Sequence, residues 1–178
     1  MKKIVLICGL ISGFLLTAMM VVSTAMCYLN DDFKGNMVLG YASMVLAFAL
    51  IFVGIKNYRD KHNNGVVSFG KAFRIGLSIT LIASSMYVIV WLIDYYLFIP
   101  DFMDKYTAHV LREAQNDGIS PADLSTKTQE LQQYKEMYKN PLFVVLFTYL
   151  EVLPIGLLIS LICALLLKKG NRSQVQPA

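Results

Sequence analysis

The sequence predicts an all-α polytopic membrane protein with four transmembrane helices and an extracytoplasmic helical hairpin between the third and fourth. Three observations favour this fold class: the composition, four long apolar runs and an uneven distribution of basic residues. The chain has 178 residues, of which 56% are hydrophobic and 16% are charged. Soluble domains are about 45–50% apolar and about 25% charged. We therefore expect a single membrane domain over residues 1–178.

Four segments are long enough to cross the hydrocarbon core, which takes about 20 apolar residues. The predicted spans cover about 4–29, 37–55, 70–99 and 141–167. The first two contain no charged residue, and Glu151 is the one charge in the fourth. The first run follows two lysines, as in a signal peptide, but signal sequences have only about 7–15 apolar residues. We therefore expect it to remain as a span.

Basic residues are concentrated at the N-terminus, between residues 56 and 74, and after residue 167. These segments hold ten Lys and Arg against one acid, whereas the other extramembrane segments hold six basic and nine acidic residues. Loops rich in Lys and Arg stay in the cytoplasm. We therefore expect both termini, a basic loop at 56–69 and a tail at 168–178 to be cytoplasmic.

The segment at about 101–139 lies on the other side and is predicted to be a helical hairpin. Apolar and aromatic residues recur at helical spacing on both sides of Gly118. Gly118 suits the end of a helix, and Ser120 followed by Pro121 suits the start of the next. An Asn-Pro pair starts the fourth span in the same way. The apolar stripes of the hairpin need something to cover them.

Each span carries small residues spaced four or seven apart, which let helix backbones approach closely in lipid. The rows are Gly9, Gly13 and Thr17; Gly40, Ala47 and Gly54; Gly76, Thr80 and Ser84; and Gly156, Ser160 and Ala164. We expect these rows to hold the bundle together. The alternative is that Gly9 and Gly13 drive homodimerisation.

Asp94 and Glu151 are candidate functional membrane acids, because an ionisable group in the bilayer costs several kcal/mol and normally faces the bundle or a wet cavity. Glu151 lies ten residues after Pro141, about 15 Å along the helix and near mid-membrane. Pro154 is a candidate kink, because it has no N–H for the carbonyl of Leu150.

Two roles are open for Glu151. It could line a pathway for a cation, proton or small solute, or it could be a neutral acid that hydrogen-bonds a tyrosine or hydroxyl and fixes helix register. Asp94 could belong to the same pathway or could snorkel to the outer interface.

Five basic residues around the second loop are candidate lipid-headgroup contacts: Lys56, Arg59, Lys61, Lys71 and Arg74. Basic clusters beside a span attract anionic lipid by about 1 kcal/mol per charge. The alternative is that these charges only set the topology.

Residues 65–72 approach the P-loop pattern, but Ala72 replaces the Ser or Thr that binds magnesium, and no apolar strand precedes them. We interpret them as a turn leading into an interfacial helix start. Catalytic, cofactor-binding and metal sites are all expected to be absent, because no nucleophile–base–acid set or histidine pair lies on one side.

Two motifs resemble domain-of-unknown-function family 4199. They are Gly54-Ile55-Lys56-Asn57-Tyr58-Arg59-Asp60 followed by Ser68-Phe69-Gly70-Lys71-Ala72-Phe73, and Pro154-Ile155-Gly156 with Ser160-Leu161-Ile162 and Ala164. The resemblance implies a small bacterial membrane protein with about four spans and no assigned activity.

The leading hypothesis is a non-enzymatic inner-membrane protein that presents its outer hairpin to an envelope protein or to another copy of itself. The alternative is a small transporter or channel subunit that uses Glu151 and Asp94 for a cation, proton or small solute. The expected partners are the lipid bilayer and either an envelope protein or a homo-oligomer, and no nucleic acid.

Overall fold

The computed structural model describes residues 1–30, 33 and 37–170. These residues form six α-helices and one π-helix. The elements are α1 (Lys2–Asn30), α2 (Met37–His62), α3 (Phe69–Ile93), η1 (Asp94–Phe98), α4 (Phe102–Asn116), α5 (Pro121–Tyr138) and α6 (Pro141–Leu167). Asp31, Asp32, Lys34 and Arg172, which contribute to the charge distribution, lie outside the described residues, as does the tail beyond Gly170.

Four helical segments are long and apolar enough to cross a membrane: α1, Val38–His62 of α2, Phe69–Phe98 across α3 and η1, and α6. They contain 29, 25, 30 and 27 residues. At about 1.5 Å per residue, each exceeds the about 30 Å of a bilayer's hydrocarbon core. The all-α class is therefore confirmed, and the four apolar runs form helices of sufficient length and apolarity to span a membrane.

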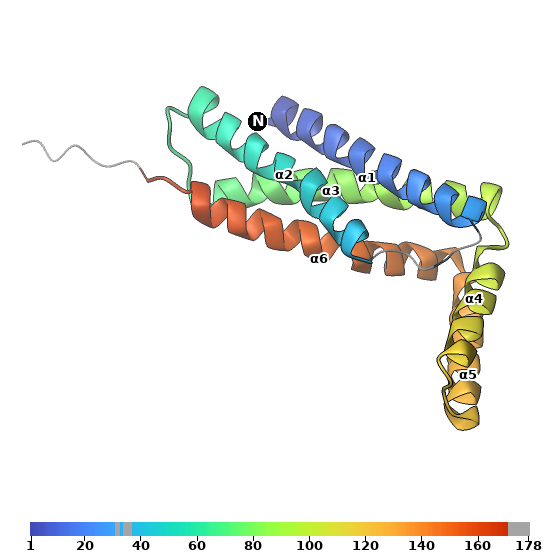
Figure 1. Cartoon of the computed structure of the whole chain (residues 1–178). Coiled ribbons are helices and arrows are strands. Elements are labelled where there is room, and N and C mark those ends of the chain that lie inside the picture. The colour runs from blue at the N-terminus through green and yellow to red at the C-terminus, as the bar shows by residue number, and fades with distance from the viewer. Residues whose placement is uncertain (31–32, 34–36, 171–178) are drawn as a thin grey trace, which may run out of the picture.

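The four long helices pack into one bundle (Figure 1). Helix α3 contacts α1, α2 and α6, and α2 contacts α1 and α6. The start of α1, the connection between α2 and α3 and the end of α6 share one end of the bundle, which we call the basic end (Figure 1). Helices α4 and α5 lie at the opposite end, the hairpin end.

An apolar core fills the space between the helices. Phe48, Ile51, Ile55 and Ile79 are fully buried in it, and Ile75 is nearly so. Large apolar side chains on all four long helices are exposed at the bundle surface. Such a surface suits lipid, because hydrocarbon tails solvate apolar side chains without cost.

Most glycines of the predicted rows lie at helix contacts inside the bundle, whereas Gly40 is exposed and a Cβ there would meet nothing within 4 Å. A Cβ at Gly9 or Gly13 would touch Ile82 or Met86 of α3, and a Cβ at Gly156 would overlap Thr80 of the same helix. The first interpretation of these rows, internal packing, is confirmed at these positions. Gly9 and Gly13 are covered by α3, so their face is closed to a second copy.

Several polar side chains within the bundle form hydrogen bonds that link one helix to another. The Ser12 hydroxyl donates to the carbonyl of Ala47 at 2.9 Å, which links α1 to α2. The hydroxyls of Thr80 and Ser160, both fully buried, lie 3.1 Å apart and link α3 to α6. In lipid each such bond contributes on the order of 0.6 kcal/mol.

The predicted hairpin is confirmed as two helices, α4 and α5, joined at residues 117–120. Gly118 adopts φ 71°, which L side chains rarely adopt. Ser120 caps α5 by accepting a hydrogen bond from the amide of Asp123 at 3.2 Å, and Pro121 starts the helix. The Asn140 side chain likewise accepts from the amide of Leu142 at 3.0 Å at the start of α6.

Helix α2 extends seven residues beyond the predicted end of the second span and stops at His62. The residues that leave the apolar run remain helical because leaving lipid does not break backbone hydrogen bonding. The helix ends where Asn64 and Gly65 adopt positive φ values of 51° and 77°. The predicted basic loop at 56–69 is therefore mostly helix, and the connection itself spans residues 63–68.

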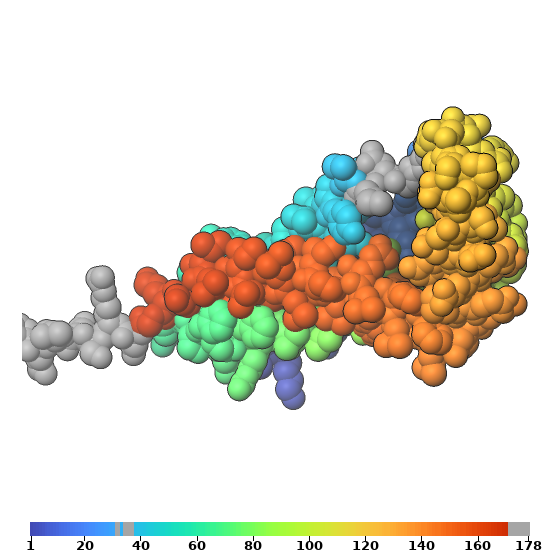
Figure 2. All heavy atoms as spheres, turned by 90° about the horizontal axis from the view of Figure 1, so that it is seen from below, coloured from blue at the N-terminus to red at the C-terminus, as the bar shows by residue number. Residues whose placement is uncertain are grey.

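Aromatic side chains join the hairpin to the bundle. Phe102 of α4 packs edge-on against Trp91 and Tyr95, with ring centroids 5.4 and 6.4 Å apart. Tyr138 of α5 packs against Tyr95 at 5.7 Å. Figure 1 shows the hairpin leaving the bundle at a steep angle, and its far end extends beyond α6. In Figure 2 the hairpin rises beside the start of α6, away from the basic end.

We expect Phe102→Ala to loosen the angle between hairpin and bundle while the bundle itself remains folded. Truncating a half-buried Phe should cost about 2 kcal/mol of hairpin docking, less than the about 3–5 kcal/mol of a fully buried one. Spin labels at Ser125 and Leu161 would show a broadened distance distribution. Tyr106→Ala is the control, because Tyr106 is exposed and stacks only on Phe102 among the described rings. An equal broadening by both variants would contradict the prediction.

Candidate functional site

Glu151 lies on the surface of the bundle. Thr148, Val152 and Gly156 occupy the inward face of α6 at four-residue spacing, and Glu151 lies about 100° around the helix from Val152. The side chain of Glu151 is exposed, as is that of its neighbour Leu150. The expectation that a membrane acid faces the bundle or a wet cavity therefore does not hold here.

The carboxylate of Glu151 forms no hydrogen bond or ion pair with the described residues. It lies within electrostatic reach of Tyr87 on α3 and Tyr138 on α5. Burial and then the Glu151 carboxylate raise the pKa of the Tyr138 hydroxyl. The hydrogen bond to a tyrosine that would fix helix register is therefore absent from the described part of the chain.

Asp94 marks a change of helix type that the sequence did not reveal. It begins the π-helix η1, and its carbonyl accepts from the amide of Ile99 at 3.0 Å, five residues on. Short π-helical turns inserted in α-helices occur often at functional sites. The side chain of Asp94 is half-buried and lies within electrostatic reach of Tyr28. Asp94 and Glu151 thus have different neighbours, and no contact joins them.

Two further features concern the candidate pathway. Helix α6 continues through Pro154, so the carbonyl of Leu150 lacks its usual amide donor there; a kink remains a prediction. Ser84 is fully buried, and its hydroxyl has no hydrogen-bond partner among the described residues. Ser84 shares a face of α3 with Tyr87 and Asp94 by helical spacing. The polar side chains on this face of α3 therefore do not form a continuous hydrogen-bonded path.

A polar cluster at the hairpin end was not predicted. The Tyr28 hydroxyl donates to Asp101 at 3.1 Å, and the Lys105 ammonium lies 3.0 Å from the same carboxylate and 4.3 Å from the centre of the Tyr28 ring. The hydrogen bond from Lys105, assisted by a weaker one from the Tyr28 hydroxyl, holds the pKa of the Asp101 carboxyl below its usual range, although burial acts in the opposite direction. Tyr28 is far in sequence from Asp101 and Lys105, so only the fold brings it to them.

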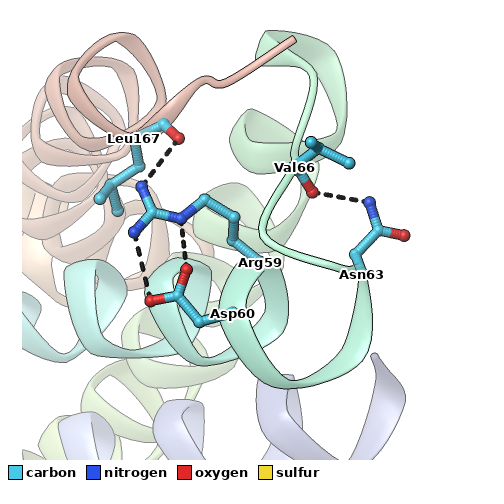
Figure 3. A network of polar contacts seen from close by, with 5 residues as sticks. All are labelled: Arg59, Asp60, Asn63, Val66 and Leu167. Carbon is cyan, nitrogen blue, oxygen red and sulfur yellow. Dashed lines mark hydrogen bonds and ion pairs between the residues drawn. The ribbon is translucent and has the colours of Figure 1, made fainter. Parts of the chain in front are cut away.

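At the basic end, Arg59 has a role within the chain. Its Nε and Nη2 donate to the two oxygens of Asp60 at 2.6 and 3.2 Å, and its Nη1 donates to the carbonyl of Leu167 at 3.4 Å (Figure 3). A cation suits the free carbonyls at the end of a helix. Arg59 therefore ties the end of α2 to the end of α6, which differs from the predicted headgroup contact.

The connection between α2 and α3 is fixed to the end of α6. The amide of Val67 donates to the carbonyl of Lys169 at 2.9 Å, and the amide of Lys169 donates back at 2.8 Å. Asn63 closes the preceding turn by donating to the carbonyl of Val66 at 2.7 Å (Figure 3). The predicted basic contacts other than Arg59 are exposed: Lys56, Lys61, Lys71 and Arg74.

A cavity of about 280 Å³ opens beside this bridge. Tyr58, Ser68, Lys71 and Lys169 line it, and of the five predicted headgroup contacts only Lys71 does so. Sequence patterns gave no signal for the cavity, because its walls come from α2, the following connection, α3 and the end of α6.

A family model described as Protein of unknown function (DUF4199) matches residues 8–169. The match covers most of the chain, including the four long helices and the hairpin. No curated protein and no solved structure matches the chain.

Proposed function

The chain belongs to the DUF4199 family, and we propose that it is a non-enzymatic integral protein of a bacterial inner membrane whose hairpin engages an envelope protein or a second copy of the chain. In this proposal both termini are cytoplasmic and the hairpin is outside. The charge distribution supports this orientation, since the three sequence segments proposed to be cytoplasmic hold ten basic residues and one acid.

The placement of the hairpin carries the proposal. Helices α4 and α5 project past α6 from the hairpin end (Figure 1), so they can meet a neighbour that the bundle does not touch. Met103, Ala114 and Leu131 are buried within the hairpin region, and Lys135 pairs with Asp104 across the two helices. The apolar stripes thus largely cover each other, contrary to the expectation that a partner must cover them.

The remaining surface of the hairpin is polar with exposed aromatic side chains. Tyr134 is 49% exposed. It lines a hollow of about 290 Å³ on α5 together with Glu130, Gln133 and Met137. Exposed tyrosines are enriched at protein interfaces because they combine apolar area with a hydrogen-bonding hydroxyl. We place the contact with the partner at this hollow.

Photo-crosslinking at Gln133 tests this function. A photoreactive side chain there should give an adduct of defined mass in intact cells, and one at Gln115, exposed on α4, is the matched control. No adduct, or equal adducts at both positions, would refute the hairpin contact. In a Cys27→Ser background, a cysteine at Gln133 should react with an impermeant maleimide in intact spheroplasts. Labelling only after lysis would show that the hairpin lies in the cytoplasm.

A second candidate function is transport of a cation, proton or small solute. It is favoured by the exposed carboxyl of Glu151, which has no hydrogen bond or ion pair in the described part of the chain. Because Glu151 faces outward from a single bundle, this function needs a second copy or another subunit to enclose the acid. Purified chain in vesicles should then show flux that Glu151→Gln removes, and unchanged flux would reject transport.

A further inference from the structure

The cavity at the basic end has the chemistry of an anion site. Lys71 and Lys169 contribute two positive charges to its wall, and no acidic side chain among the described residues lines it. Ser68 caps α3 here by accepting from the amide of Lys71 at 3.4 Å. The first amides of this 25-residue helix point toward the same end and carry its positive partial charge.

Tyr58 supplies an independent indication of a ligand. Its side chain is only 9% exposed and lines the cavity, yet its hydroxyl donates to no group among the described residues. The hydroxyl is not among the described side-chain atoms that are both buried and unpartnered, so it is accessible and free to donate to a group that enters the cavity. The Lys71 ammonium lies 5.9 Å from the centre of the Tyr58 ring, so a charge and a free donor flank the same space. An anionic oxygen in the cavity would accept from both.

The walls are held in place before any ligand arrives. The reciprocal backbone bonds between Val67 and Lys169 fix the end of α6 beside the start of α3. Arg59 ties α2 to α6 from the other side. A preorganised site of this kind loses little ordering entropy on binding.

The surroundings indicate where the anion comes from. The cavity lies at the end of four membrane-spanning helices, where phospholipid headgroups lie. Phe69 is exposed beside it and stacks on Phe73 at 6.0 Å, which suits contact with acyl chains while Lys71 stays at the headgroups. At about 280 Å³ the cavity is smaller than most sites for drug-sized ligands but has room for a phosphate group.

We propose that this cavity binds the phosphate group of an anionic phospholipid. Lys71 and Lys169 balance its charge, the Tyr58 hydroxyl donates to it, and the amides at the start of α3 contact its oxygens. Free phosphate has the same chemistry and is the competing source.

Binding of short-chain phosphatidylglycerol to the purified, delipidated full chain in detergent tests the proposal. We expect the double variant Lys71→Gln/Lys169→Gln to bind with a Kd about 25-fold higher, because each charge removed lowers the affinity about fivefold. Tyr58→Phe should weaken it about fivefold, because one hydrogen bond is lost. Lys61→Gln is the matched control, since Lys61 is exposed at the same end but does not line the cavity. Circular dichroism would confirm that each variant is folded.

Three results would overturn the proposal. The first is an equal loss of affinity per charge removed, about fivefold in Lys61→Gln against about 25-fold in the double variant, which would show diffuse attraction rather than a site. The second is equal affinity for phosphatidylcholine, which carries no net charge. The third is tight binding of inorganic phosphate that phosphatidylglycerol does not displace, which would assign the cavity to free phosphate.

Discussion

Gly156→Val should lower the free energy of unfolding by about 3 kcal/mol, the upper part of the range for an overpacked core. A Cβ at position 156 would overlap the Thr80 methyl group and lie 2.9 Å from Phe48 Cζ. Neither neighbour can move aside, because both are fully buried and Thr80 is β-branched and bonded to Ser160. The helices α3 and α6 must therefore separate.

The matched control is Gly40→Val in α2, where an added Cβ would meet nothing within 4 Å. It makes the same change of helix propensity, so the difference between the two variants isolates the helix contact. Gly13→Ala is a second control, because its Cβ would meet the flexible Met86 side chain. Unfolding by SDS in mixed micelles gives the three free energies. Equal losses for Gly156→Val and Gly40→Val would contradict the close packing of α3 on α6.

The helices of this fold can be predicted from residues that are close in sequence, whereas the contacts between the helices cannot. Apolar length gave the four spans, and Gly118, Ser120 and Pro121 gave the hairpin with its turn, because capping depends on a few adjacent residues. Phe102 of the hairpin meets Trp91 across the end of the bundle, and we expect this contact to set the steep angle of the hairpin. Such a contact between separate helices leaves no periodic mark in the sequence.

For the candidate sites too, the sequence predicted which residues are present but not which of them meet in the fold. Spacing placed Asp94 and Glu151 in the spans but could not say which way Glu151 faces, since one residue shifts a side chain by about 100°. Charge counting found the basic end but did not separate Arg59, which is bonded inside the chain, from Lys71, which lines the cavity. Lys169 reaches that cavity only through its pairing with Val67.

Glu151→Leu should raise the free energy of unfolding in bicelles by roughly 2–3 kcal/mol, the scale of an acid removed from a membrane helix. The exposed carboxyl forms no hydrogen bond or ion pair in the described part of the chain, so its removal breaks no internal contact. The exposed side chains of Leu150 and Leu158 beside it indicate a lipid-facing surface. A leucine at position 151 would extend that surface.

The control is an acid placed at the same face and a similar depth. Leu158 lies seven residues after Glu151, about two turns along α6, and is 58% exposed. Leu158→Glu should lower the free energy of unfolding by about as much as Glu151→Leu raises it. A destabilised Glu151→Leu would instead show that Tyr87 or Tyr138 holds the carboxyl in place. If the stability rises while partner binding or flux is lost, the protein keeps a destabilising acid because its function requires one.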